Sequence, residues 1–286
     1  MSFTAGFLNV LKPPGMSSHD VVARVRRFVP RKTKVGHLGT LDPAATGVLP
    51  VAVAGATRLI PILPDLGSKM KAYLAEIELG VSTDTDDLEG EVLSRHRLDS
   101  LGFEQRDWQA ELAPFQGEIS QVPPQVSAIR KDGQRAYAMV RKGQTVELAA
   151  RQMRVERCDF LGYRPETCRL RFFLVCSSGT YVRSIARDLG DRLGVGGALA
   201  FLVRTQSGPF ALEDAVTLEA LAGQGVEAHL LPWSYPFSEL PSRDETLREK
   251  GNVLRGDYEP GTRYVAKNGL LLGTESPGEA KVEAVF

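Results

Sequence analysis

Cysteine and histidine are scarce in this chain of 286 residues, which contains three cysteines and four histidines. Cys158, Cys168 and Cys176 form no CxxC pair, and their odd number argues against a disulfide framework and favours a reducing compartment. The histidines are scattered, so no cluster has the ligand spacing of a structural metal site. The sequence therefore predicts a cytoplasmic protein without a bound metal.

Long hydrophobic runs are also missing. No apolar stretch approaches the roughly 18 to 20 residues of a membrane-spanning helix, and the first residues lack the pattern of a signal peptide. Hydrophobic residues still make up 43% of the chain, which is enough for a sizeable core. The length favours one large domain or two, and we expect no association with a membrane.

The chain has no net charge, which usually argues against a nucleic-acid partner, but its charges are unevenly distributed. Residues 1–71 contain ten lysines and arginines against three acidic residues, and residues 127–155 contain seven against two. Between them, residues 72–126 contain three against twelve. A basic surface acts locally by neutralising phosphates, so an RNA partner remains open. Ordinary solvated faces explain the same blocks.

Apolar patterning predicts a mixed α+β fold. Apolar or alternating runs predict strands over 7–11, 48–54, 73–79 (half-exposed) and 170–176, and helical spacing predicts helices over 19–28, 100–116, 135–142 and 180–193. Because these elements do not alternate strictly as βαβ units, a mixed, largely antiparallel sheet is expected. After residue 232 the composition changes, and short strands over 263–265, 270–272 and 281–286 predict a small β-rich domain.

Residues 34–50 are rich in glycine and proline and contain one carboxylate, Asp42. Pro43 disfavours a helical conformation at Asp42, while Gly36, Gly39 and Gly47 permit backbone angles that other residues resist. Asp42 is therefore expected on a shaped loop, where catalytic groups often lie. An aspartate that only stabilises a turn explains the local pattern equally well.

Two further segments carry side chains suited to the same chemistry. Arg183 lies at a predicted strand-to-helix junction and could pair with a carboxylate such as Asp42, although a surface arginine is the simpler explanation. Tyr73 could stack on a base, an interaction of roughly 1–3 kcal/mol, or pack in the core. The acidic run over 83–90 lacks the residues of a calcium loop at Leu88 and Glu89 and predicts a solvated turn.

These segments occur in an order that resembles the TruB family of tRNA pseudouridine synthases. The family signature around its catalytic aspartate, Gly-His-x-Gly-x-Leu-Asp-Pro-x-Ala-x-Gly-x-Leu, reads here from Gly36 to Leu49. The other matching segments are 12–18, 71–73 with 79–87, 127–137, 178–183 and 202–205. The resemblance extends from about residue 7 to residue 232, and its ordered motifs are far more specific together than singly.

The resemblance implies a catalytic domain of the pseudouridine synthase type over residues 1–232, with an RNA-binding insertion near 120–155. It implies a short PUA-like RNA-binding domain over 237–286. The substrate would be the T loop of tRNA, with uridine 55 flipped out of its stack and isomerised to pseudouridine. No cofactor, metal or protein partner is implied, and a cytoplasmic monomer is expected.

The resemblance also implies roles for individual residues. Asp42 would be the nucleophile, attacking either the ribose carbon or the base, Arg183 would pair with it, and Tyr73 would stack on the target base. The remaining implied residues would bind substrate: His37, Asp87, Tyr181, Lys12 and Arg204.

Some features depart from the family or leave alternatives open. Ser178 replaces a lysine that many members carry, and the extensions of the dyskerin-type enzymes are missing. A non-catalytic tRNA-binding protein or RNA chaperone is one alternative. A glycosidase-like hydrolase that uses Asp42 and Asp87 is another.

Overall fold

Contacts within the computed structural model divide the chain into two compact units. Unit 1 comprises Met1–Lys69 and Gln206–Phe286, and unit 2 comprises Met70–Thr205. The structure describes residues 3–61, 63, 70–98, 102–126, 130–131, 134–135, 148–237, 242–243, 253–255, 263–266, 270–276 and 279–285. No helix in these described residues is long and apolar enough to cross a membrane.

Unit 1 is built on β1 (Gly6–Lys12), which pairs antiparallel with β3 (Thr46–Val53) on one side and β14 (Leu231–Pro232) on the other. The short strand β2 (Val35–His37) also pairs with β3. Successive side chains of a strand point to opposite faces, and both faces here are covered. This explains the continuous apolar runs that predicted β1 and β3, because nearly every residue of these two strands is buried.

Two hydrophobic clusters fill the two faces of β1 and β3. Leu8 and Val51 contribute to a cluster with α1 (Ser18–Val25) and α5 (Leu218–Gln224), whereas Phe7 and Ala52 contribute to a cluster with η1 (Ala54–Leu59). The other short elements of unit 1 are β13 (Phe210–Ala211), η6 (Leu212–Asp214), η7 (Glu227–His229) and η8 (Tyr235–Phe237).

Helix α1 shows how the sequence specifies a local element. Ser17 caps its N-terminus by accepting a hydrogen bond from the Asp20 backbone N–H, and the Asp20 carboxylate accepts from the Ser17 N–H in return. Val21, Val22 and Val25 are buried at helical spacing. The predicted helix over 19–28 is thereby confirmed, although it begins one residue earlier and ends at Val25.

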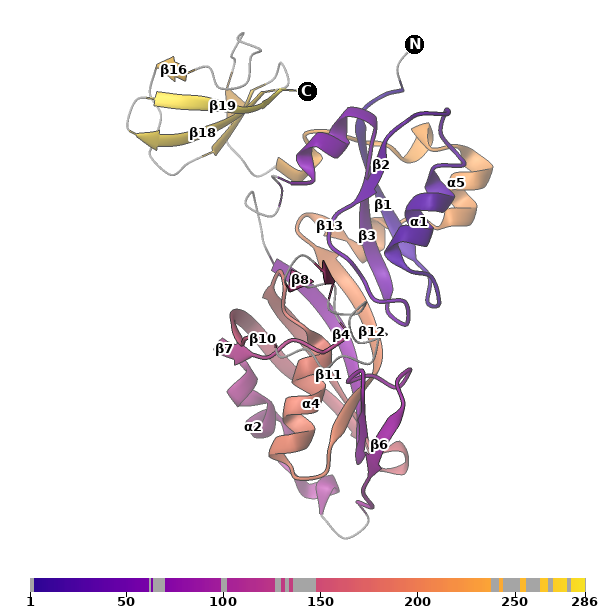
Figure 1. Ribbon diagram of the computed structural model, residues 1–286, viewed down its shortest axis with the longest axis vertical. Coiled ribbons are helices and arrows are strands. Elements are labelled where there is room, and N and C mark those ends of the chain that lie inside the picture. Colours follow the sequence, from indigo (N-terminus) through magenta and orange to yellow (C-terminus); the bar gives the residue numbers. More distant parts are fainter. Residues whose placement is uncertain are drawn as a thin grey trace. The chain divides into compact units, whose positions relative to one another are not determined.

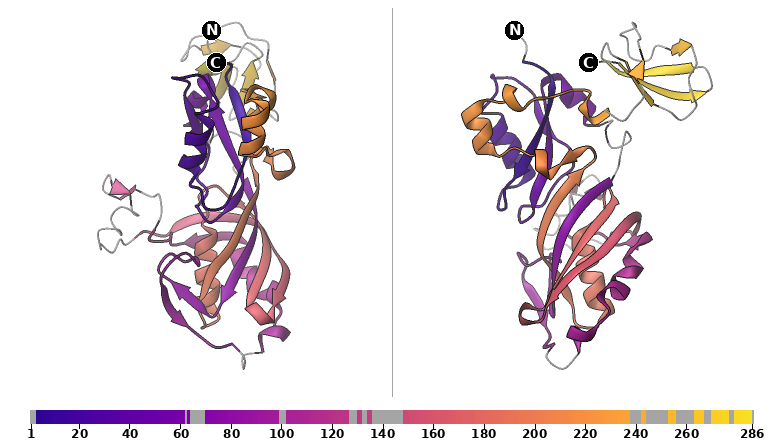
Figure 2. Two further views of the ribbon diagram at one scale, coloured as in Figure 1. Left: turned by 90° about the vertical axis from the view of Figure 1, so that its right-hand side faces the viewer. Right: turned by 180° about the vertical axis from the view of Figure 1, so that it is seen from behind.

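Unit 2 is a sheet with the strand order β12–β4–β11–β10–β7, and β11 pairs antiparallel with both of its neighbours. The strands are β12 (Gly197–Ser207), β4 (Met70–Leu79), β11 (Arg169–Ser177), β10 (Arg151–Arg164) and β7 (Gly117–Gln121). Helices α2 (Trp108–Leu112) and α4 (Val182–Arg192) lie on the same face of this sheet (Figures 1 and 2). Two hairpins complete the unit: β5 (Val81–Thr83) with β6 (Val92–Arg95), and β8 (Arg130–Lys131) with β9 (Gln134–Arg135).

The C-terminal segment forms a five-stranded sheet with the order β15–β17–β18–β19–β16. Its strands are β15 (Ser242–Arg243), β16 (Val253–Arg255), β17 (Arg263–Ala266), β18 (Leu270–Ser276) and β19 (Glu279–Val285). The expectation of a small C-terminal β-rich part is confirmed, as is the α+β class with a mixed, largely antiparallel sheet. The domain boundaries predicted at 1–232 and 237–286 stay a prediction.

Three predicted elements differ from the structure. Strand β4 is mostly buried instead of half-exposed, and even Glu76 is buried beside Arg171. The helix expected over 100–116 is three short pieces, η3 (Phe103–Gln105), α2 and η4 (Ala113–Phe115), since Pro114 cannot continue α2. The helix expected over 135–142 lies outside the described residues except at Arg135, which is in strand β9.

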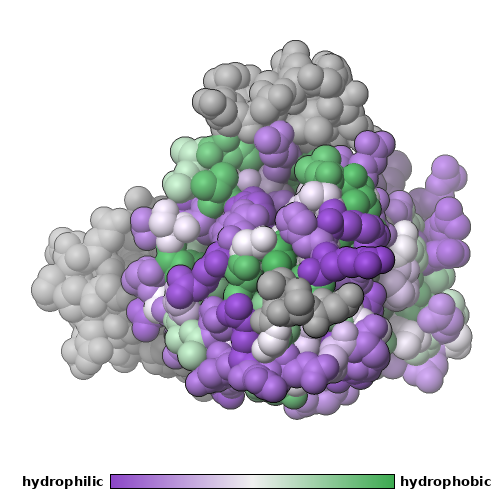
Figure 3. Space-filling model, turned by 90° about the horizontal axis from the view of Figure 1, so that it is seen from below, coloured by the Kyte–Doolittle hydropathy of each residue, from purple (hydrophilic) through white to green (hydrophobic). Residues whose placement is uncertain are grey.

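Most of the surface coloured by hydropathy in Figure 3 is hydrophilic, with small hydrophobic patches between. The most exposed large hydrophobic side chain among the described residues is Leu93, at 69%. Single exposed apolar residues are normal for a globular protein and need no partner to explain them.

Candidate active site

Asp42 lies in the loop of residues 38–45 that connects β2 to β3 in unit 1. Gly39 has φ 72° and Gly47 has φ 109°, angles that glycine adopts without the steric cost of a side chain. The Leu38 N–H donates to the Pro50 carbonyl at 2.9 Å, which closes the loop at its base. Asp42 is half-buried. The prediction that Asp42 lies on a shaped loop is confirmed.

Buried side chains hold the backbone on both sides of Asp42. The Ser18 hydroxyl accepts a hydrogen bond from the Leu41 N–H at 2.8 Å and donates one to the Leu41 carbonyl at 2.9 Å. On the other side, Lys12 Nζ donates to the Pro43 carbonyl at 3.0 Å. The residues that precede and follow Asp42 are therefore both fixed, and the carboxylate has little freedom to move with its loop.

Lys12 is fully buried, and its ammonium group also donates to the carbonyls of Pro13 at 2.9 Å and Met16 at 2.6 Å. An ammonium has three N–H donors, so three backbone carbonyls match its capacity. This geometry favours a role in holding the loop over direct contact with substrate. His37 is half-buried at the end of β2, opposite Val51, and leads into the loop; its substrate-binding role stays a prediction.

In unit 2, a buried glutamine fixes the junction between β11 and α4. The Gln121 amide donates to the Tyr181 carbonyl at 2.9 Å and accepts from the Tyr181 N–H at 2.8 Å. Tyr181 is the residue that precedes the first turn of α4. This arrangement sets the direction in which the helix starts, and thereby the position of Arg183.

Arg183 is only 6% exposed, so it is not the surface arginine that the sequence alone would favour. Its two terminal nitrogens donate to the carbonyls of Thr85 at 3.0 Å and Val126 at 3.2 Å. The Nη1 atom, which donates to Thr85, lies 3.7 Å from Asp87 Oδ2. The structure thus brings together two predicted site residues, Arg183 and Asp87. The predicted pair of Arg183 with Asp42 joins two units and stays a prediction.

The acidic turn over 83–90 is solvated only in part: Asp84, Leu88 and Glu89 are exposed, as its sequence predicts, whereas Asp86 and Asp87 face arginines of α4. The Asp87 carboxylate accepts from the Thr85 hydroxyl at 2.7 Å and the Glu89 N–H at 3.1 Å. Asp86 accepts from Arg187 at 2.9 Å. Burial raises the pKa of Asp86 above its ordinary value, although the charges of Arg187 and Arg183 oppose this shift. The turn therefore keeps its shape through contacts with the arginines of α4.

Tyr73 is buried in β4 opposite Leu174 of β11. Lys71, on the same side of β4, lies opposite Cys176. Burial and, to a smaller extent, the charge of Arg204 lower the pKa of Lys71 to about 8. Arg204 itself is fully buried on the neighbouring strand β12. Lys71, two residues from Tyr73, and Arg204 on the neighbouring strand therefore influence each other through their charges.

Ser18, Gln121 and Lys71 are functional candidates for which the sequence gave no role. Ser18 is adjacent to the helix cap Ser17, and its contact with Leu41 spans 23 residues. The contact of Gln121 with Tyr181 spans 60 residues. Of the three, only Lys71 could have been found from the local sequence. It lies two residues from Tyr73 on a predicted strand, so both side chains point to the same face of the sheet.

The fold is that of the pseudouridine synthases. A crystal structure of a Cbf5-Nop10-Gar1 complex matches with a TM-score of 0.67 and 25% identity, over 98% of this chain and 84% of that chain. A structure of an H/ACA RNP bound to a substrate RNA containing 2′-deoxyuridine matches with a TM-score of 0.66 and 24% identity, with the same coverage; at this identity the likeness concerns the fold alone.

The sequence comparisons narrow this class to one family. Residues 26–182 match the N-terminal domain of the TruB family pseudouridylate synthases, and residues 183–232 match the tRNA pseudouridylate synthase B C-terminal domain. The tRNA pseudouridine synthase B of Gloeothece citriformis is 50% identical over 81% of this chain and 73% of its own length. That of Moorella thermoacetica is 48% identical over 82% and 77%. The chain belongs to the TruB family and is a pseudouridine synthase, which is an isomerase.

Proposed function

We propose that the protein converts uridine 55 in the T loop of tRNA to pseudouridine, with Asp42 as the nucleophile. The relatives named tRNA pseudouridine synthase B support a tRNA substrate. The observation that carries the assignment of Asp42 is its presentation on a loop whose neighbours, Leu41 and Pro43, are fixed by Ser18 and Lys12. A catalytic group must be held in a productive geometry to contribute its full effect.

The reaction is an isomerisation in which atoms and electrons balance without a co-reactant. The bond from uracil N1 to ribose C1′ breaks, and a bond from C5 to C1′ forms after the base has rotated. One proton leaves C5 and one is gained at N1. A carboxylate suits this sequence because it can form a covalent bond and later leave again. Attack of Asp42 on the ribose carbon and attack on the base are both compatible with this balance.

The other site residues would act on an extruded nucleotide. The target base must leave its stack to reach Asp42, and Tyr73 would then stack on it. Arg183 would hold the Asp42 carboxylate, and the substrate-binding residues would be His37, Asp87, Tyr181 and Arg204, with Lys12 supporting the loop. The protein would act as a cytoplasmic monomer without a protein partner. RNA binding would involve the insertion near 120–155 and the PUA-like segment 237–286.

The test is site-mapped pseudouridine formation on unmodified tRNA by the wild type and by Asp42→Asn. Wild type should modify position 55, and the variant should lose turnover while its affinity for tRNA stays within about twofold, because the substitution is nearly isosteric. Normal turnover by Asp42→Asn would refute the assignment of the nucleophile. Absence of product with wild type would favour the non-catalytic RNA-binding alternative, and release of free uracil would favour the hydrolase.

A further inference from the structure

Unit 1 contains a basic concavity that none of the predicted site residues lines. It has a volume of 700 Å³ and is formed by residues 3–5, 30–34, 54–55 and 57–58. Four of its side chains are cations, Arg31, Lys32, Lys34 and Arg58, and none is a carboxylate. A concave surface lined by one sign of charge attracts ligands of the opposite sign.

These four cations are exposed. In the part of the chain that the structure describes, none of them forms an ion pair with a carboxylate. Few carboxylates are close to these cations in the sequence: residues 21–64 contain seven lysines and arginines and a single acidic residue, Asp42. The charge therefore remains available to a ligand.

Two walls of the concavity have an unusual backbone. Lys32 has φ 75° and Ala54 has φ 55°, in the left-handed region that residues other than glycine rarely adopt. Hydrogen bonds maintain this shape: the Ala54 N–H donates to the Lys34 carbonyl at 2.8 Å, and the Thr57 hydroxyl donates to the Ala54 carbonyl at 2.8 Å. Such strained conformations persist where the surrounding structure holds them, and they concentrate at functional sites.

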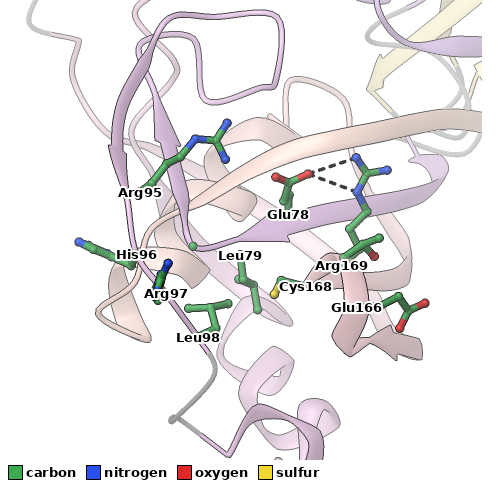
Figure 4. A pocket seen from close by; sticks show the side chains of 11 residues that line it. Glu78, Leu79, Arg95, His96, Arg97, Leu98, Glu166, Cys168 and Arg169 are labelled. Carbon is green, nitrogen blue, oxygen red and sulfur yellow. Dashed lines mark hydrogen bonds and ion pairs between the residues drawn. The ribbon is translucent and has the colours of Figure 1, made fainter.

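A second concavity, in unit 2, shows why charge matters more than size. It has a volume of 730 Å³ and contains Arg95, Arg97 and Arg169, but also Glu78 and Glu166 (Figure 4). Arg169 is already bound to Glu78, with a distance of 3.1 Å between the guanidinium and the carboxylate. Its charges are mixed and partly paired, so it does not offer a comparable site for an anionic ligand.

Within unit 1, the basic concavity and Asp42 lie toward opposite ends of β3. Lys34 and Ala54 are at the end of the β2–β3 pair that is opposite to Gly47, where the loop joins β3. The seven residue-to-residue steps from Gly47 to Ala54 span about 23 Å at the usual rise of a strand. A ligand in the concavity is therefore not the target nucleotide.

We propose that this concavity binds the sugar–phosphate backbone of the tRNA substrate outside the T arm. The inference rests on the proposed function, because it takes tRNA as the RNA that the protein binds. Contacts to phosphates supply affinity without reading sequence. The site would thus raise the affinity for whole tRNA without taking part in the chemical step.

The test compares wild type with the triple variant Arg31→Ala, Lys32→Asn, Arg58→Ala. Asparagine is chosen at Lys32 because it tolerates the left-handed backbone there. A matched control, Arg157→Ala, Arg164→Ala, Arg192→Ala, removes the same charge from exposed arginines of unit 2 that lie outside the predicted RNA-binding insertion. Affinities for full-length tRNA and for a T-arm hairpin are measured over a range of salt concentrations.

The triple variant should bind full-length tRNA roughly tenfold or more weakly, with a salt slope that is smaller by about 2 to 3, and should bind the hairpin like wild type. Its KM for tRNA should rise while kcat is retained. Unchanged binding, an equal loss for hairpin and tRNA, or the same loss in the control variant would overturn the proposal. Binding to vesicles containing phosphatidylserine is measured in parallel. A variant that loses affinity for the vesicles but binds tRNA like wild type would also overturn the proposal. If wild type formed no pseudouridine, the proposed function would fail. This result is distinguishable from a failure of the binding proposal, which is measured by affinity for tRNA.

Discussion

The Asp42 loop of unit 1 and the Tyr181–Arg183 junction of unit 2 are fixed by the same device but differ in their charges. In each, one buried polar side chain binds both backbone groups of one residue: Ser18 binds Leu41, and Gln121 binds Tyr181. Beyond that, Lys12 donates to neutral carbonyls beside the loop, whereas Arg183 also faces the Asp87 carboxylate.

Because of this difference in charge, we expect the two regions to respond differently to substitutions and to pH. The contacts around Leu41 and Pro43 join a hydroxyl and an ammonium to backbone groups that do not titrate. The contacts around Arg183 and Arg187 include carboxylates, and burial raises the pKa of two of them, Asp86 and Asp188. Substitutions that remove charge should therefore damage the second region most, and only the second region should respond to mild acid.

Arg183→Met should have the largest effect on stability. The variant leaves the carbonyls of Thr85 and Val126 without these donors and removes the cation that is ion-paired with the Asp87 carboxylate. Loss of one partner from a buried charge pair costs about 3–5 kcal/mol, and urea denaturation should show a decrease of this order in the free energy of unfolding. Arg183→Lys serves as the control, since it keeps the charge but not the two-armed geometry, and should recover part of the loss. A Met variant within about 1 kcal/mol of wild type would show that the junction does not depend on this charge.

Ser18→Ala tests the first region. The variant leaves the N–H and carbonyl of Leu41 unsatisfied, which should cost about 1–3 kcal/mol and lower kcat, because the residue preceding Asp42 loses its support. The adjacent Ser17→Ala is a matched control, since it removes a helix cap worth roughly 0.5–2 kcal/mol with no contact to Leu41. We expect Ser17→Ala to lower stability without changing kcat. An equal decrease of kcat in both variants would indicate a general structural effect.

The sequence predicted the features that are encoded locally. Proline and glycine around Asp42 predicted its loop, and apolar runs predicted β1, β3 and β11. The hydrogen bonds from Ser18 to Leu41 and from Gln121 to Tyr181 were not predictable. The partners are 23 and 60 residues apart, and no local sequence pattern records such a contact. The burial of Glu76 depends in the same way on Arg171 across the sheet.

Asp86→Asn should have the smallest effect and the clearest dependence on pH. Asparagine retains an oxygen that can accept from Arg187 and tolerates the φ of 62° at this position, so the free energy of unfolding at pH 7 should change by less than about 1 kcal/mol. Burial raises the pKa of Asp86 in the folded state, so the folded protein binds a proton more readily than the unfolded chain. The wild type should therefore gain stability relative to Asp86→Asn as the pH falls through this raised pKa, and lose that advantage toward neutral pH. Denaturation of both proteins at pH 7 and about pH 4, near the ordinary pKa of aspartate, measures the difference. A difference that does not depend on pH would mean that desolvation of Asp86 is balanced by its arginines, and that the second region is no more sensitive to acid than the first.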